Sequence, residues 1–405
     1  MTTNRFTKLL FVLAVAAGIG SPAVAGLLTP RTDINPAVLY WQAFSLYPDL
    51  PGDIKKELLA DPPRLPAADA KEPLKKFDRM VEYLRRATRM KVPCDWGIDL
   101  SEGPATLMPN LVKIRQAVQA VQMRAHYALE AGRDREAMEE LGAILVLGRN
   151  SGTDGTLVST MMAIAVEDTV NRFVAANFHR FSPQALQSFL KQVDAAPPRP
   201  TIKHAMSIEK TAFWEWFIVK LEALRATPSK DNAQAMEAAR ELLTSSLGSG
   251  SEVDRIMEKA GNTPDHLIAY FREVEPFYAA IQKAADATPS QLEREANTIR
   301  QLTEGSSNQI AQVIFPNVAR ARKNELGAIV HAAMVRAAVT LRLEGEDAFE
   351  KLRDPFGNGP FTLRRLPAES GEVGFELDSG LSQIRTNTAL KFMEDFSRKP
   401  AGKVE

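Results

Sequence analysis

The chain has 405 residues, of which 45% are hydrophobic and 25% are charged, and 50 basic residues balance 50 acidic ones. A chain without net charge carries no overall electrostatic footprint for nucleic acid or for an anionic membrane, so neither is an expected partner. Cys94 is the single cysteine, which excludes an intramolecular disulfide, and we expect its thiol to be buried.

The first 25 residues have the pattern of a signal peptide. Arg5 and Lys8 precede an apolar run over 9–19, and Ala23-Val24-Ala25 supplies the small-x-small site that signal peptidase requires. We therefore expect a signal peptide at 1–25 and an exported protein that is periplasmic or extracellular. No later run reaches about 18 consecutive apolar residues, so we expect no integral membrane segment after signal removal. An uncleaved anchor is the alternative, because apolar residues continue past the cleavage site.

Helix signals recur along most of the remaining chain. Side-chain caps followed by a first-turn proline mark several starts, as at Ser182-Pro183, Thr263-Pro264 and Thr288-Pro289. A Gly/Ser stretch at 246–251 divides the helical part into 26–246 and 252–352. Apolar spacing predicts a helical hairpin over 111–148 that turns at Gly132, and other helices over 36–47, 74–84, 156–178, 183–194, 202–226, 231–246, 264–287, 289–303 and 307–344.

The pattern changes after Arg353, where turn-forming residues precede two runs that look like strands, Phe361–Leu366 and Val373–Leu377. Two strands alone are marginal in water, so we expect this unit, 353–383, to pack on the preceding helix. The tail 399–405 is expected to be disordered. The fold class is therefore all-α, built mostly from antiparallel helical hairpins, with an irregular α-solenoid as one arrangement and a small C-terminal β-hairpin.

The segment 124–148 of the predicted hairpin resembles a tetratricopeptide unit. It places small residues, a turn glycine and a large residue where that family has them. The positions that carry the resemblance are Ala125, Ala128, Gly132, Ala137 and Leu141.

The C-terminal sequence 335–381 carries a second resemblance. A helix, the motif Asp354-Pro355-Phe356-Gly357-Asn358 and the strand Gly374-Phe375-Glu376-Leu377 are similar to the C-terminal part of type II secretion pseudopilins. They are also similar to uncharacterised exported bacterial helical proteins that end in a helix and an Asp-Pro-Phe β-hairpin. The second group fits better. A pseudopilin has a glycine cleavage site ahead of its apolar helix, whereas here the cleavage pattern Ala23-Val24-Ala25 follows the apolar run. That resemblance implies an architecture and no activity.

The sequence offers few residues for chemistry. Glu167-Asp168 interrupts an apolar helix, and a buried carboxylate pair could do acid/base work. Adjacent helix positions point about a hundred degrees apart, so we interpret the pair as a solvated helix edge. We expect no metal site and no cofactor, because none of the histidines stands three to five residues from another: His126, His179, His204, His266 and His331.

The densest aromatic cluster comprises Phe213, Trp214, Trp216 and Phe217. Core packing between neighbouring helices is the favoured interpretation, and a partner-binding surface is the alternative. The basic group around Arg86 and Arg89 is interpreted as a solvated helix face.

Two functions remain open at this level. The first is a protein-binding or scaffold role with other proteins of the cell envelope, without enzymatic activity. The second is an envelope hydrolase that cuts cell-wall polysaccharide with a pair of carboxyl groups.

Overall fold

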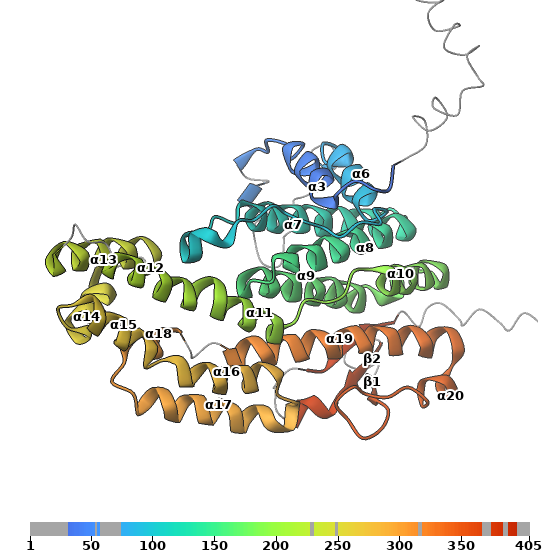
Figure 1. Cartoon of the computed structure of the whole chain (residues 1–405). Helices are drawn as coiled ribbons and strands as arrows, with labels where there is room; N and C mark the ends of the chain where they lie inside the picture. The colour runs from blue at the N-terminus through green and yellow to red at the C-terminus, as the bar shows by residue number, and fades with distance from the viewer. Residues whose placement is uncertain are drawn as a thin grey trace, which may run out of the picture.

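The computed structural model describes residues 31–52, 55–56, 74–226, 231–247, 250–314, 318–366, 374–383 and 388–394. Within these ranges the chain is all-α with a small antiparallel sheet near its C-terminal end, as expected (Figure 1). The predicted signal peptide and the predicted disordered tail lie outside the described residues.

The first part of the chain stacks pairs of helices in layers (Figure 1). The predicted hairpin is confirmed, and its turn closes on Gly132 at φ 72°, with the Arg133 N–H donating to the Ala128 carbonyl at 2.8 Å. From top to bottom the layers are α3 (Pro36–Ser45) with α6 (Asp78–Ala87), α7 (Pro109–Glu130) with α8 (Asp134–Ser151), and α9 (Leu157–Ala176) with α10 (Pro183–Ala195).

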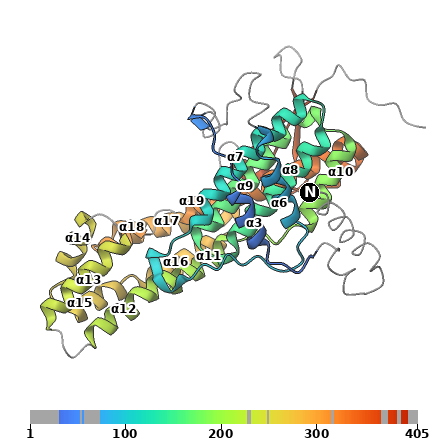
Figure 2. The ribbon, with the colours of Figure 1, turned by 90° about the horizontal axis from the view of Figure 1, so that it is seen from above.

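The middle of the chain forms an arm that extends away from these layers (Figure 2). The predicted helix 264–287 is two helices, because Pro276 lies in the first turn of the second and cannot donate a backbone hydrogen bond there. Thr263 caps the first of them, as expected. The elements are α11 (Ile202–Glu209), the π-helical turn η5 (Lys210–Glu215), α12 (Trp216–Arg225), α13 (Asn232–Leu247), α14 (Gly250–Ala260), α15 (Pro264–Arg272), α16 (Glu275–Asp286), α17 (Pro289–Glu304) and α18 (Gln309–Ile314).

The long helix α19 (Val318–Glu344) lies beneath α9 and leads through α20 (Glu346–Phe349) to the sheet. Length and composition alone would let α19 cross a membrane, and it is the one helix of the described ranges that meets this test. Here 61% of its most apolar window is buried inside the protein. It also carries a buried carboxylate, Glu325, and a buried imidazole, His331.

The C-terminal sheet has three strands, so the expected two-stranded hairpin was incomplete. The strands β1 (Thr362–Leu366), β2 (Gly374–Asp378) and β3 (Leu390–Met393) pair antiparallel in sequence order. A strand of four residues is too short to show a clear alternation of apolar side chains, which is why β3 was missed. Phe375 and Phe392 pack edge-on against Phe178 in the 3₁₀ turn that follows α9, and β3 also contacts α9 and α19, so the sheet rests on both helices.

Two hydrophobic cores result from this arrangement. The first joins the stacked layers, part of α19 and the sheet, and the second fills the arm. The second core contains Leu243 from one side of the Gly/Ser stretch and Val253 from the other. Helix α19 contributes to both, with Leu326 in the first core and Ala328 in the second.

Candidate functional site

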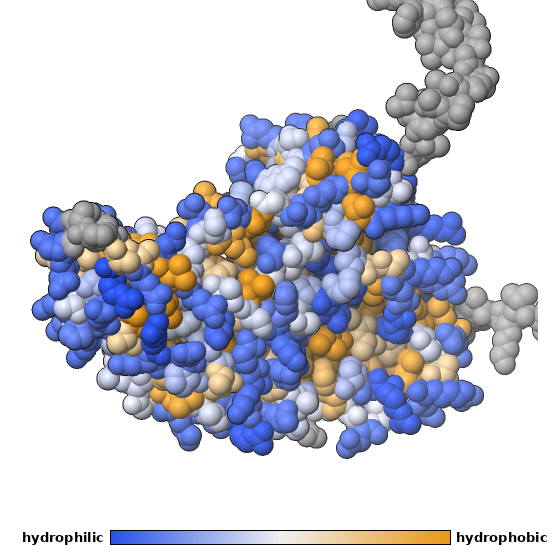
Figure 3. Space-filling model, viewed as in Figure 1, coloured by the Kyte–Doolittle hydropathy of each residue, from blue (hydrophilic) through white to orange (hydrophobic). Residues whose placement is uncertain are grey.

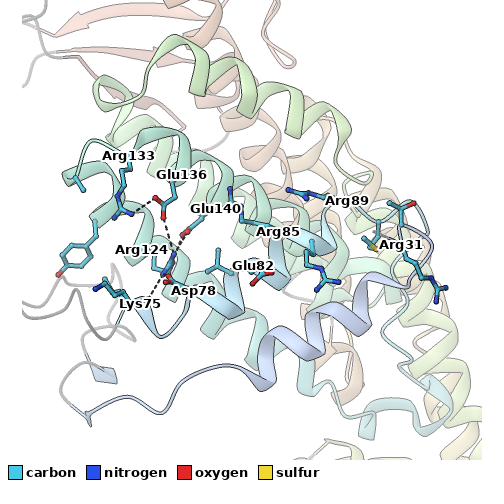
Figure 4. A pocket seen from close by; sticks show the side chains of 17 residues that line it. Arg31, Lys75, Asp78, Glu82, Arg85, Arg89, Arg124, Arg133, Glu136 and Glu140 are labelled. Carbon is cyan, nitrogen blue, oxygen red and sulfur yellow. Dashed lines mark hydrogen bonds and ion pairs between the residues drawn. The ribbon is translucent and has the colours of Figure 1, made fainter. Parts of the chain in front are cut away.

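A cleft of about 1050 Å³ opens between α6, α7 and α8 (Figure 4). We call it the arginine groove, because basic side chains outnumber acidic ones in its lining. The basic residues are Arg31, Lys75, Arg85, Arg86, Arg89, Arg124 and Arg133, and the acidic ones are Asp78, Glu82, Glu136 and Glu140.

Helix α6 forms one wall of the groove because its sequence is amphipathic. Met80 and Leu84 are fully buried, and Val81 is nearly so, which fixes one face of the helix against the core. Side chains at the intervening positions must then point outward, and these include Glu82 and Arg86. The charged wall is therefore a direct consequence of the apolar spacing in α6.

The inner end of the groove is organised by Arg124 on α7. Its guanidinium donates to both carboxylate oxygens of Glu140 on α8, at 2.8 and 3.2 Å. It also donates to Asp78 at 2.6 Å and to the Leu74 carbonyl at 2.8 Å. Because Glu140 is buried, this bidentate pair ties α7 to α8, and the other two bonds tie both to the start of α6.

Acid/base chemistry by the carboxyl groups of this end is not favoured. Burial raises the pKa of Glu140, and the hydrogen bonds and charge of Arg124 oppose that rise. Glu136 is engaged as well, because it accepts from Arg133 at 2.9 Å. A pair of carboxyl groups that cuts polysaccharide needs one group to donate a proton and the other to attack or activate water. Both oxygens of Glu140 already accept hydrogen bonds from Arg124, so neither is placed to donate a proton to a substrate or to activate water.

The outer end of the groove is different. Figure 4 shows Asp78, Glu136 and Glu140 gathered around Arg124, Glu82 between the two ends, and Arg85, Arg89 and Arg31 toward the other end. Arg31 pairs with Asp33 and Arg85 with Glu139. Within the described ranges, the exposed Arg86 and Arg89 pair with no carboxylate. Arg86 lies over the Tyr83 ring at 5.0 Å. The outer end therefore presents guanidinium groups to solvent.

The face of the molecule drawn in space-filling form is mostly polar (Figure 3). On the face shown in Figure 3, hydrophilic side chains dominate, and hydrophobic ones form small separate groups. A broad apolar docking patch is not visible on that face, so recognition there would depend on charge and hydrogen bonds.

The aromatic cluster predicted from the sequence lies in the arm and does not line the groove. Trp214 and Phe217 are buried in the second core, where each packs against Phe271 at a ring-centroid distance of 5.4 Å. Trp216 and Phe213 are only partly buried.

Trp216 contacts the 3₁₀ turn that precedes α7 through a hydrogen bond and through its ring. Its indole N–H donates to the Ser101 carbonyl at 2.7 Å. A Cβ atom at Gly103, where φ is 60°, would lie only 2.4 Å from the indole ring. Trp216 therefore has a structural contact, and glycine is required opposite it.

The interpretation of Glu167-Asp168 as a solvated helix edge was wrong for Glu167. Its carboxylate is 1% exposed and accepts from Arg149 at 3.0 Å and from Arg199 at 2.6 and 2.7 Å. Asp168 points to another side, where it pairs with Arg172 at 2.8 Å and with the Nδ1 atom of His331. Two arginines remote in sequence stabilise the buried charge, and no local pattern reveals them.

Metal and thiol chemistry find little support. In the described part of the chain, no three His, Cys, Asp or Glu side chains are grouped to hold a metal ion. Cys94 is buried as predicted, and burial raises the pKa of its thiol to about 12, which leaves little reactive thiolate at neutral pH.

Comparison with known proteins gave no match to a family model, to a curated sequence or to a solved structure.

Proposed function

We propose that the chain is an exported binding protein of the cell envelope, and that its arginine groove holds an acidic segment of a partner protein. The observation that carries this proposal is the charge of the groove. The whole chain has as many acidic as basic residues, yet seven basic and four acidic side chains line this cleft. Arg86 and Arg89 at its outer end are exposed and pair with no carboxylate of the described residues.

The chemistry of the groove supports a carboxylate ligand. A guanidinium group presents several donors in a plane, which matches the two oxygens of an Asp or Glu side chain. Leu74 and Met90 add apolar contact along the same cleft. Exposed ion pairs contribute about 0.2 to 1 kcal/mol each. A few such contacts with modest apolar burial would give weak, salt-sensitive binding with Kd in the millimolar to micromolar range.

Export is part of the same proposal and has its own test. If residues 1–25 are a signal peptide, the chain recovered from outside the cytoplasm begins at Gly26. Mass spectrometry of that chain checks the cleavage site. Recovery of a chain that still begins at Met1 or Thr2 would contradict export by cleavage.

The binding role is tested with a charge-reversed groove. The mature protein, the double variant Arg86→Glu/Arg89→Glu and the control Lys259→Glu/Arg300→Glu serve as baits in envelope extract. The control makes the same change of net charge at exposed positions on α14 and α17. We expect the wild type and the control to capture the same acidic proteins, and the groove variant to lose them.

A parallel screen separates this proposal from the hydrolase alternative. The wild type, Glu140→Gln and Glu82→Gln are each incubated with purified cell-wall polysaccharide, and released saccharides are measured. Suppose that the wild type and Glu82→Gln release saccharides and that Glu140→Gln does not. That result would favour the hydrolase and contradict a purely binding role for the groove.

A further inference from the structure

A second cavity lies between α8, α9, α10 and α19, away from the arginine groove. Its volume is about 490 Å³, and most of its lining is apolar, including Phe189, Ile329 and Phe361. We call it the inner pocket. Cavities of this size that combine an apolar wall with a few polar groups are typical of small-molecule sites.

Arg149 provides one polar group of the inner pocket, and its neighbours hold it in place. One terminal nitrogen donates to Glu167 at 3.0 Å, and the other donates to the carbonyls of Pro197 at 3.1 Å and Val193 at 3.4 Å. The side chain is buried, with 8% of the residue exposed. Its Nε–H has no hydrogen-bond partner among the described residues. A fixed arginine thus keeps one donor unused.

Asn171 provides a second unused donor. It follows Glu167 by one helical turn on α9, so the two side chains lie on the same face of that helix. Asn171 is 2% exposed, and its Nδ2 atom also has no partner in the described part of the chain. Buried donors are costly to leave unsatisfied, and both residues line the same cavity, which gives that cavity a polar end suited to a ligand that accepts hydrogen bonds.

The charge around the inner pocket is positive. Arg149 and Arg199 share the single carboxylate of Glu167. Glu325 is near Arg199 but is paired with Arg322. At the rim, Arg336 pairs with Asp194. Arg353 is exposed there and forms no ion pair with the described residues. The acceptor that matches this charge is an anion.

We propose that the inner pocket binds a small carboxylic acid with an apolar body. The carboxylate lies at the polar end of the pocket, which Arg149, Arg199 and Asn171 line, and the hydrocarbon lies against Phe189 and Phe361. This site does not depend on the arginine groove, because the two cavities share no lining residue.

The test uses decanoate as the probe, with decanol as its uncharged analogue, both below their aggregation limits. Binding to the full protein is measured by calorimetric titration. We expect decanoate to bind and decanol to bind at least about tenfold more weakly, because the decanol hydroxyl carries no negative charge to pair with a guanidinium. Equal affinity for the two compounds, or no binding of decanoate, would overturn the proposal.

Two variants locate the ligand. Asn171→Leu removes a donor at nearly constant volume, and Ala333→Phe fills the pocket. We expect each to weaken decanoate binding by about tenfold or more, while Asn297→Leu, at an exposed position on α17, leaves it unchanged. Retention of wild-type affinity by both pocket variants would overturn the proposal. The double variant Arg86→Glu/Arg89→Glu is expected to bind decanoate normally, which keeps this test separate from that of the groove.

Discussion

Two arginine–carboxylate networks in this molecule use the same chemistry in opposite proportions. Around Arg124, one guanidinium lies among three carboxylates, Asp78, Glu136 and Glu140. Around Glu167, two guanidiniums share one carboxylate. The first network fastens α6, α7 and α8 to one another. Arg86 and Arg89, which pair with no carboxylate of the described residues, stay outside it at the outer end of the groove. The second keeps its positive charge inside the fold, next to a cavity. The burial of each network and its ratio of arginines to carboxylates together determine where positive charge remains available to a ligand.

The largest effect is expected when the shared carboxylate is removed. Glu167→Leu leaves Arg149 and Arg199 buried without their partner, which should cost about 3 to 5 kcal/mol in the free energy of unfolding. Urea unfolding at neutral pH measures this loss. Glu82→Leu is the control, because Glu82 is exposed and its loss should change stability by no more than about 0.5 kcal/mol. A similar small change for Glu167→Leu would mean that the buried network contributes little.

Disrupting the Arg124 network should lower the free energy of unfolding by a smaller amount, and that amount should depend on pH. Arg124→Met leaves Glu140 buried and unpaired, at a cost of about 3 kcal/mol near pH 7. Because burial raises the pKa of Glu140 above its value in the unfolded chain, protonation of this carboxyl is favoured in the folded state. The loss should therefore shrink as the pH falls toward about 4. Unfolding measured at both pH values tests this, and a loss that grows on acidification would contradict it.

Asp168 offers a third and smaller effect, with the opposite dependence on pH. Burial alone would raise the pKa of Asp168, but His331 and Arg172 outweigh it and lower the pKa to about 2. A carboxyl whose folded pKa is depressed stabilises the fold above its unfolded pKa and loses that contribution as the pH falls through the folded value. Asp168→Asn should therefore cost about 2 kcal/mol at neutral pH. The cost should disappear between about pH 4 and pH 2. A cost that persists at the lower pH would show that ionisation of Asp168 is not its source.

The sequence predicts local features of the fold well. Helix caps at Ser182 and Thr263, the turn glycine Gly132 and the buried Cys94 all depend on neighbouring residues or on composition, and each is confirmed. Features that depend on residues far apart in the sequence were not predicted. The buried state of Glu167 requires Arg199, which lies 32 residues away.

The same limit applied to the candidate site. Arg124 and Glu140 are 16 residues apart on two helices, and charged residues next to core positions of a hairpin are ordinarily interpreted as solvated. The tetratricopeptide-like spacing could have placed them on facing helices, but it carries no information on which charges are paired. Arg86 and Arg89 were recognised as a solvated helix face. Their position along a cleft became visible only in the three-dimensional arrangement.

The smallest effect on stability is expected at these two arginines. Arg86→Glu/Arg89→Glu should change the free energy of unfolding by about 0.5 kcal/mol or less, because both side chains are exposed. The arginines near the last turn of α6 interact favourably with the helix end, and the loss of this interaction should contribute only a few tenths of a kcal/mol. Thermal unfolding checks this, and a loss above about 2 kcal/mol would assign the arginines a structural role.

The central claim, that the arginine groove binds acidic segments, is tested most directly by fluorescence anisotropy with a labelled oligoglutamate peptide. We predict that the wild type and Lys259→Glu/Arg300→Glu bind the peptide at low salt, that the affinity falls as salt is added, and that Arg86→Glu/Arg89→Glu loses the binding. Equal affinity for an oligolysine peptide of the same length, or unchanged oligoglutamate binding by the groove variant, would contradict the account.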